Sequence, residues 1–97
     1  MNAVEKKLIE LKNMGAASVN ILNAIGVRTS ADLAAIGSVQ AYRRIRQRGI
    51  HVSRAMLYAM EGALMDVHWK SLDPALKVQL VQMADRIERE ESESEKA

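Results

Sequence analysis

The sequence predicts an all-α fold, a compact bundle of five to six short helices joined by tight turns. Two observations predict it. Apolar residues recur at helical spacing through most of the chain. Four of the five glycines separate these periodic segments at nearly regular intervals, at positions 15, 26, 37 and 49, where glycine can end a helix in the left-handed conformation. The only strand-like alternation, over residues 50–53, is too short to propose a sheet.

The first three helices are expected over residues 3–14, 17–25 and 29–36. The first rests on four apolar side chains, from Val4 to Met14, that fall on one stripe of a helix. The third begins at Thr29, whose hydroxyl can accept the amide proton of Asp32 in the arrangement of a capping box.

The last three helices are expected over residues 38–48, 53–67 and 74–89. Ser38, Ser53 and Asp73 are their candidate N-caps, and Pro74 follows in the first turn, where proline is preferred. The helix over 53–67 is apolar nearly all round, which is typical of the buried centre of a small domain.

The composition sets the size and chemistry of the molecule. With 97 residues the chain forms one domain, predicted over residues 1–90, followed by a flexible acidic tail over 91–97. The sequence has no Phe, one Trp, two Tyr and six Met, so the core is expected to be aliphatic. The absence of Cys excludes disulfides and thiolate chemistry. No signal peptide or membrane span is recognisable, so we expect a cytoplasmic protein.

The net charge of +2 is distributed unevenly. Residues 33–60 contain five arginines and no acidic residue, whereas residues 85–97 contain six acids and three bases. This pattern predicts an anionic partner or self-association, in which the acidic end meets the arginines of a second copy. We expect a monomer or a weak homodimer. The alternative is a solvated helix face that keeps the domain soluble. Partner or phosphate contacts are assigned to Gly26, Arg28, Arg43, Arg44, Arg48 and Arg54. Arg46 falls close to the apolar arc, so we expect it to snorkel or to pair internally.

The sequence carries no motif for catalysis or for cofactor or metal binding. His51 and His68 lack the spacing of metal ligands, and no glycine-rich phosphate loop occurs. Glu61, a lone carboxylate in an apolar helix, is the one candidate general base. We favour a structural role for it, pointing outward or paired with an arginine, because a single carboxylate rarely makes an active site. We therefore expect no enzyme, no cofactor and no metal.

Residues 21–33 resemble half of a helix-hairpin-helix: a helix, a Gly-apolar turn, then a capped helix. In DNA-binding members the turn is Gly-apolar-Gly, and its amides bind a phosphate near a helix N-terminus. Here Arg28 replaces the second glycine. A second candidate turn, Gly49-Ile50-His51, follows a poorer pattern, since Arg44 and Gln47 occupy the expected apolar positions.

Together these segments resemble the C-terminal domain of the TfoX/Sxy family, bacterial regulators of competence for DNA transformation. The resemblance covers roughly Leu8 to Leu80. It is carried by Leu11–Gly15, Ile25–Val27, Thr29, Asp32–Leu33, Ile36–Tyr42, Leu57–Leu64, His68–Trp69 and Leu72. It implies an all-helical fold with helix-hairpin-helix character and a role in regulation rather than catalysis. Full-length members also carry an N-terminal α/β domain, which is expected to be missing here.

Three functions follow as hypotheses. The first is a protein-interaction module in transcriptional regulation, whose partner, a transcription factor or polymerase subunit, presents an acidic surface. The second is direct, sequence-independent DNA binding through the hairpin turn and the arginines. An enzyme that uses Glu61 as its base ranks far last.

Overall fold

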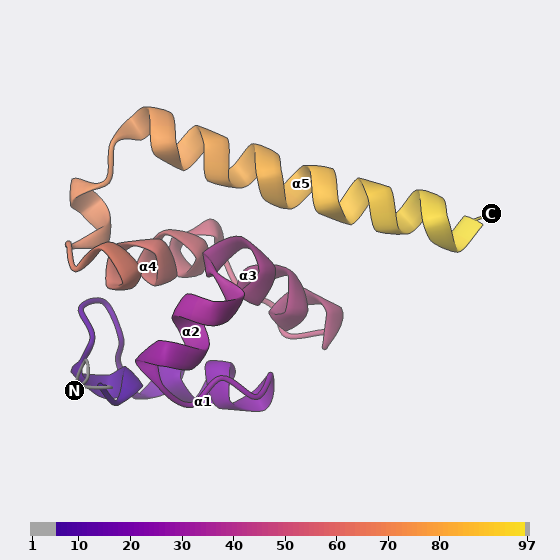
Figure 1. Ribbon diagram of the computed structural model, residues 1–97. Coiled ribbons are helices and arrows are strands. Elements are labelled where there is room, and N and C mark those ends of the chain that lie inside the picture. Colours follow the sequence, from indigo (N-terminus) through magenta and orange to yellow (C-terminus); the bar gives the residue numbers. More distant parts are fainter. Residues whose placement is uncertain (1–5, 97) are drawn as a thin grey trace.

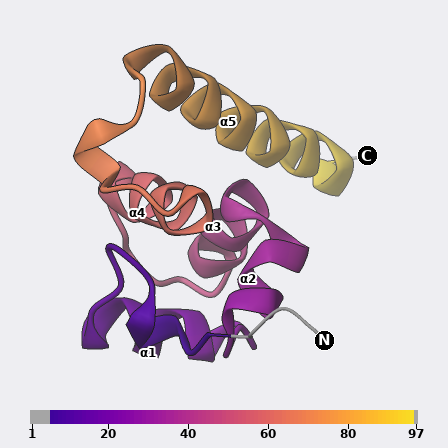
Figure 2. The ribbon, with the colours of Figure 1, turned by 60° about the vertical axis from the view of Figure 1, so that its left-hand side comes forward.

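The computed structural model describes residues 6–96, with side chains placed for residues 6–92, and this part of the chain is helical without a named strand. The elements are η1 (Leu8–Glu10), α1 (Ala16–Ala24), α2 (Ser30–Ile36), α3 (Ser38–Gln47), α4 (Arg54–Met65), η2 (Trp69–Ser71) and α5 (Pro74–Lys96), where η denotes a 3-10 turn. Figures 1 and 2 show three tiers: α5 lies over α3 and α4, which lie over α1 and α2. The predicted all-α class is confirmed.

The predicted helix over residues 3–14 is wrong for its described part, which contains only the short turn η1. The reason lies in long-range backbone bonds. The amide of Ser30 donates to the carbonyl oxygen of Lys6 at 3.0 Å, and Lys7 forms an isolated antiparallel bridge with Thr29. Backbone groups that bond to the start of α2 are not available to a local helix, so these contacts override the apolar spacing.

The apolar stripe of this segment nevertheless reaches the core. Leu8 and Met14 are buried, and Leu11 packs against the core residues. Val4 lies outside the described residues. Between Leu11 and Met14 the chain turns at Asn13, whose φ of 69° is left-handed, a conformation that asparagine tolerates better than most residues.

Two helix pairs are joined by the same kind of turn. The turn after α1 contains Gly26 (φ 85°), and the amide of Val27 bonds back to the carbonyl of Leu22 at 3.0 Å. The turn after α3 contains Gly49 (φ 81°), and the amide of Ile50 bonds back to the carbonyl of Ile45 at 3.3 Å. Both are Schellman-type ends, for which glycine is preferred because it lacks a clashing Cβ. The structure therefore contains two hairpins, α1–α2 and α3–α4, where the sequence favoured only the first.

The caps agree with the sequence in part. Thr29 accepts the Asp32 amide proton at 3.2 Å, and Asp73 accepts from the Ala75 amide at 2.8 Å, as predicted. Ser53 stands at the N-cap of α4 but makes no side-chain cap bond. The cap assigned to Ser38 is wrong, because Gly37 takes the N-cap position of α3. The hydroxyl of Ser38 is used elsewhere, as described below.

The core is aliphatic and draws on every tier, as the composition predicted. Its largest fully buried side chains are Leu8, Leu22, Leu33, Ile45, Leu57 and Met60. α4, the helix predicted to be central, buries Met56, Leu57, Ala59, Met60, Gly62 and Ala63. α5 adds Leu80 and Ala84 from above. Burying each large aliphatic side chain contributes roughly 1.5–3 kcal/mol, so six of them account for a large share of the stability of such a small domain.

α5 is longer than predicted, since it continues to Lys96 rather than ending near Arg89. Figure 1 shows its C-terminal part running out over the end of α3. Glu91 of this part is half-buried against α3. The flexibility assigned to residues 91–97 stays a prediction.

The side chain of Asn13 joins three distant segments. Its Nδ2 donates to the carbonyl oxygens of Ala59 (3.3 Å) and Val67 (3.0 Å), and its Oδ1 accepts the amide proton of Trp69 at 3.1 Å. Both amide protons and the oxygen of the side chain are thereby used. Gly62 allows this approach: a Cβ at this position would lie 2.6 Å from Asn13 Nδ2 and 2.8 Å from the Val67 oxygen.

We predict that Thr29→Ala lowers the free energy of unfolding by about 1 kcal/mol, since it removes an N-cap acceptor. Ser53→Ala is the matched control, because Ser53 occupies the same cap position without a side-chain bond, and it is expected to cost less than about 0.5 kcal/mol. Urea unfolding followed by circular dichroism measures both. Equal losses in the two variants would contradict the capping assignment.

We predict that Gly62→Ala lowers the free energy of unfolding by roughly 2–3 kcal/mol, because the added methyl group disrupts the Asn13 contact as well as crowding the backbone. The loss should shrink in an Asn13→Ala background, where the nearest crowding atom is gone and the Val67 oxygen remains, so the double-mutant cycle is non-additive. Gly15→Ala, which adds a Cβ with nothing within 4 Å, is the control. A fully additive cycle would show that the Asn13 contact does not limit residue 62.

Candidate functional site

The structure brings together three of the six residues assigned to partner contact. Gly26, Arg44 and Arg48 line a shallow pocket of about 360 Å³, together with Ala24, Ile25 and Gln47. We call these six residues the arginine pocket. It lies where the end of α1 meets the last turns of α3, because both helices end in the glycine turns described above. The sequence could not place these segments together, since they belong to different hairpins.

Arg44 and Arg48 are the exposed cations of this pocket. Both side chains are exposed, and neither makes an ion pair or side-chain hydrogen bond within the described part of the chain. Part of their role is local, since cations near a helix C-terminus complement the carbonyl ends of the helix dipole. Two adjacent, unneutralised guanidinium groups can also bind a carboxylate or a phosphate.

Arg43 and Arg46 are occupied by acids from α5. Arg43 pairs with Glu91, which also accepts from Gln47 Nε2 at 2.8 Å. Arg46 Nε lies 2.6 Å from Glu88 Oε1, and the guanidinium lies 5.5 Å from the centre of the Tyr42 ring. The hydrogen bond and charge of Glu88 raise the pKa of Arg46 above its ordinary value.

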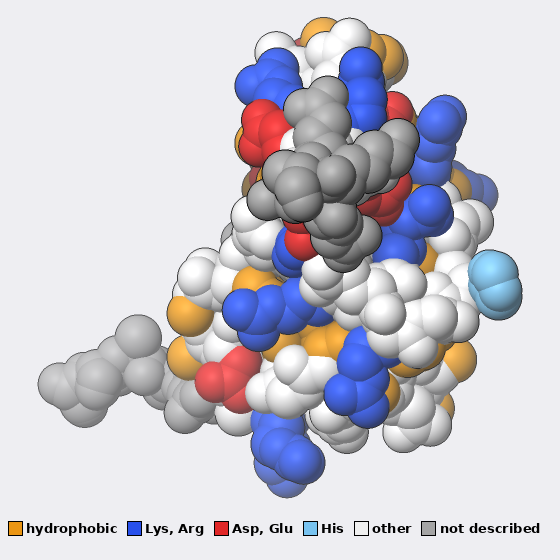
Figure 3. Space-filling model, turned by 90° about the vertical axis from the view of Figure 1, so that its right-hand side faces the viewer, with side chains coloured by type: hydrophobic (Ala, Val, Ile, Leu, Met, Phe, Trp, Pro, Cys, Tyr) orange, Lys and Arg blue, Asp and Glu red, His pale blue; other side chains and the backbone are white. Residues whose placement is uncertain are grey.

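These pairs bear on two sequence predictions. Internal pairing of Arg46 is confirmed. The acidic part of α5 meets arginines of α3 within the same chain, and the weak homodimer stays a prediction. Figure 3 looks onto this end of the molecule and shows that acidic and basic side chains lie close together on it. Partner contact by Arg43 therefore requires that Glu91 be displaced.

The first hairpin turn already binds an anionic group of its own chain. Asp32 Oδ2 accepts the amide protons of Arg28 (3.0 Å) and Thr29 (3.2 Å). The bond from the Arg28 amide is the main reason that the pKa of Asp32 is lowered from its ordinary value. The side chain of Arg28 points into solvent and lines no part of the arginine pocket. Two amides that would face a phosphate at this turn are thus occupied.

The second hairpin turn is more open. Arg54 is the first residue of α4 and is exposed, as are Gly49 and His51 before it. The sequence underrated this turn because Arg44 and Gln47 stand where apolar residues were expected. In the structure these two side chains face outward, and Ile45 supplies the buried contact instead.

Glu61 has a structural partner. Its Oε1 accepts a hydrogen bond from the hydroxyl of Ser38 at 2.7 Å, and the side chain is half-buried beside the start of α3. The expected alternative partner, an arginine, is therefore replaced by a serine. This hydrogen bond ties α4 to α3. Within the described residues no group of three or more His, Asp or Glu side chains is arranged to hold a metal ion.

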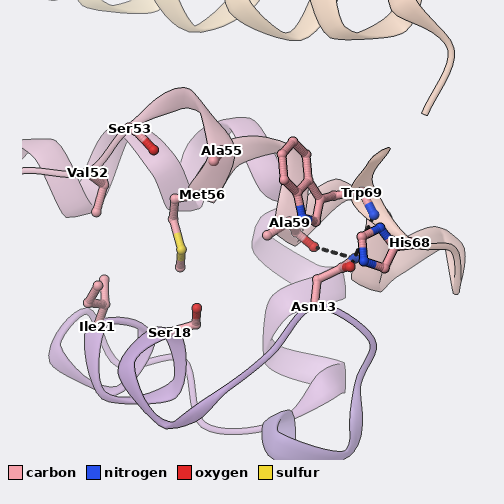
Figure 4. A pocket seen from close by; sticks show the side chains of 10 residues that line it. All are labelled: Asn13, Ser18, Ile21, Val52, Ser53, Ala55, Met56, Ala59, His68 and Trp69. Atoms are coloured by element: carbon pink, nitrogen blue, oxygen red, sulfur yellow. Dashed lines mark hydrogen bonds between the residues drawn. The ribbon is translucent and has the colours of Figure 1, made fainter. Parts of the chain in front are cut away.

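A second hollow, not predicted from the sequence, lies between α1 and α4 (Figure 4). It has a volume of about 390 Å³. Its lining residues are Asn13, Ser18, Ile21, Val52, Ser53, Ala55, Met56, Ala59, His68 and Trp69. Asn13 contributes no free hydrogen-bonding group, because its amide is saturated by backbone contacts. The hollow is mainly a gap between packed elements with an aliphatic floor.

Trp69 forms one end of this hollow and is part of the packing. Its ring stacks on Tyr58 with the ring centres 6.4 Å apart, and the ammonium group of Lys77 lies 5.4 Å from the centre of each of these rings. His68 stacks on Trp69 at 6.2 Å. The cluster fastens η2 to α4 and to the first turns of α5. The ammonium group of Lys77 thus lies over the rings of both Tyr58 and Trp69.

No helix in the described part of the chain is long and apolar enough to cross a membrane.

Comparison with known proteins assigns the chain to a family. The chain matches the TfoX C-terminal domain over residues 4–84. It is 28% identical to Protein Sxy of Escherichia coli (strain K12) over 82 residues, which is 84% of this chain but only 39% of the length of Protein Sxy.

Two crystal structures are similar to this fold, both of a protein from Listeria monocytogenes. The triclinic form of an uncharacterized protein superposes with a TM-score of 0.77 at 34% identity, covering 84% of this chain and 93% of that one. A tetragonal form of a protein of unknown function gives 0.75 at 34% identity, covering 81% and 98%. The family match spans most of the chain, and the hairpins and the Asn13–Gly62 contact lie inside it. The chain belongs to the TfoX C-terminal domain family.

Proposed function

We propose that this domain is a non-enzymatic interaction module that regulates transcription in competence for DNA transformation and acts through a protein partner. Family membership and the similarity to Protein Sxy support the regulatory role. Because the chain spans 39% of that relative, the role of the whole relative is carried over as part of the proposal. A cytoplasmic location agrees with it.

The observation that carries the proposal is which arginines of α3 are paired with acidic residues and which are not. Arg44 and Arg48 are exposed and unpaired within the described residues, whereas Arg43 and Arg46 are neutralised by α5. The arginine pocket is therefore a compact cationic spot rather than a long basic stripe. A spot of two guanidinium groups suits an acidic surface on a transcription factor or polymerase subunit, where it would set orientation and association rate.

Sequence-independent DNA binding is the second candidate. One observation favours it: Gly26, the centre of a hairpin turn, lies beside Arg44 and Arg48 in one pocket. Two others weigh against it. Asp32 occupies amides of that turn, and the acidic part of α5 covers the neighbouring arginines and would repel a phosphate backbone.

A binding role fits the site better than catalysis. The single carboxylate considered as a base, Glu61, is hydrogen-bonded to Ser38 at the junction of two helices. General-base catalysis needs a carboxylate within reach of a substrate proton and a group that stabilises the developing charge. The residues that line a hollow together with Glu61 are mostly aliphatic, and its polar side chains besides Glu61 are Ser38 and Gln40.

For the DNA candidate we predict no saturable binding with a dissociation constant below about 10 µM to a random-sequence duplex at about 50 mM salt, measured by fluorescence anisotropy. Micromolar binding that collapses at about 200 mM salt and is abolished by Arg44→Glu with Arg48→Glu would instead establish DNA binding. Arg86→Glu with Arg89→Glu is the control, since it makes the same charge change on exposed residues of α5.

For the protein-partner proposal we predict that Arg44→Glu with Arg48→Glu, introduced into the native cell, lowers transcription of DNA-uptake genes by roughly tenfold or more, because reversed charges at a contact repel an acidic partner. Transcript levels and transformation frequency are the measurements, with the melting temperature confirming a folded variant. The Arg86→Glu, Arg89→Glu control should remain near the native level. Unchanged transcription in the Arg44, Arg48 variant would exclude the arginine pocket from the regulatory contact.

A further inference from the structure

The basic side of α3 is divided between two sites that share Gln47. This side chain lines the arginine pocket and also the hollow between α3 and α5, where it donates to Glu91. This hollow between α3 and α5 has a volume of about 290 Å³, and its lining residues are Arg43, Arg46, Gln47, Glu88, Glu91 and Ser92. The two sites therefore form one continuous surface on α3, part of which is covered.

The cover is the stretch of α5 over residues 88–92, which we call the acidic end of α5. The last apolar side chain before it that packs against the core is Ile87. Within the acidic end, Arg89, Glu90 and Ser92 are exposed. Glu88 and Glu91 bond to α3, through the ion pairs and the Gln47 hydrogen bond. No apolar side chain of residues 88–92 adds to the core, so polar contacts are the main interactions between this part of the helix and α3.

Such contacts are weak enough to be exchanged. The side chains of Arg46 and Glu88 are 46% and 35% exposed, and those of Arg43 and Glu91 are 16% and 30% exposed. Partly exposed ion pairs such as Arg46–Glu88 contribute little net stability and weaken with salt, whereas the more buried Arg43–Glu91 pair is screened less. An external carboxylate pair placed on the same arginines would regain the same interactions.

The spacing of these ion pairs also indicates which kind of partner segment could bind to this surface of α3. Glu88 and Glu91 are three residues apart on one helix, and they meet Arg46 and Arg43, which are three residues apart on another. Residues with this spacing lie on the same side of a helix, one turn apart. The surface on α3 therefore accommodates a helix that presents two carboxylates one turn apart.

We propose that Arg43, Arg46 and Gln47 form a docking surface for an acidic helix of a partner protein, and that the acidic end of α5 occupies this surface in the unbound domain. The proposal rests on the proposed function, because the acidic helix is taken to belong to the partner whose acidic surface binds the arginine pocket. Docking displaces Glu88 and Glu91 and joins Arg43 and Arg46 to Arg44 and Arg48 in one cationic face.

The test uses the full chain with Glu88→Gln and Glu91→Gln. The matched control is Asp85→Asn with Glu90→Gln, which makes the same charge change on exposed residues of the same helix. The probe is a fluorescein-labelled peptide with the sequence of residues 84–96, followed by anisotropy at about 50 mM salt. A second peptide carries E88Q and E91Q. Hydrogen exchange of the amides of residues 88–92 reports independently on release of the acidic end.

We expect the E88Q/E91Q chain to bind the acidic peptide about tenfold more tightly than the control chain does, because two intramolecular ion pairs no longer compete. Exchange of amides 88–92 should accelerate in the same variant. The gain should vanish with the E88Q/E91Q peptide, and also when Arg43→Gln and Arg46→Gln are added to the chain.

Equal affinity of the E88Q/E91Q and control chains for the peptide would overturn the proposal. So would a gain that appears with a 15-base-pair DNA duplex, offered as a second probe, but not with the peptide, since the surface would then serve nucleic acid. The proposed function fails separately, through the Arg44, Arg48 variant in the cell. Suppose that the E88Q/E91Q chain gains affinity for the peptide while the Arg44, Arg48 variant transcribes normally in the cell. The docking surface of Arg43, Arg46 and Gln47 would then act without the arginine pocket.

Discussion

The side-chain amide of Asn13 is the contact on which the arrangement of the tiers depends. The segment before α1 has almost no regular structure of its own, yet it delivers Leu8 and Met14 to the core. Its position is fixed by three hydrogen bonds from one amide to backbone groups of α4, the following turn and η2. All three partners are main-chain atoms, which must be bonded when they are withdrawn from water. Gly62 leaves the room that this amide needs.

The parts of the fold that the sequence predicted are governed by local rules. The glycine ends at Gly26 and Gly49, the capping box of Thr29 and Asp32, and the Asp73–Pro74 start of α5 all form as short-range chemistry requires. The central place of α4 followed from its apolar residues. In each case the residues that decide the conformation lie within one or two helical turns of each other.

The parts that the sequence did not predict depend on partners far along the chain. The helix expected over residues 3–14 is replaced because Lys6 and Lys7 bond to the start of α2. Ser38 does not cap α3 because its hydroxyl bonds to Glu61, on α4. Of the candidate site, sequence analysis assigned Gly26, Arg44 and Arg48 to partner or phosphate contact, but their convergence in one pocket requires the packing of two hairpins.

The division of the arginines into occupied and exposed groups follows from how α5 packs. Leu80 and Ala84 fix this helix over α3 and α4 by their burial, and Ile87 continues the same apolar side. The helix then carries Glu88 past Arg46 and Glu91 past Arg43. Arg44 and Arg48 lie on the neighbouring side of α3, since residues four apart lie one above the other. The acidic residues of α5 therefore do not pair with them. The apolar packing of one helix thereby determines which cations the domain presents to a partner.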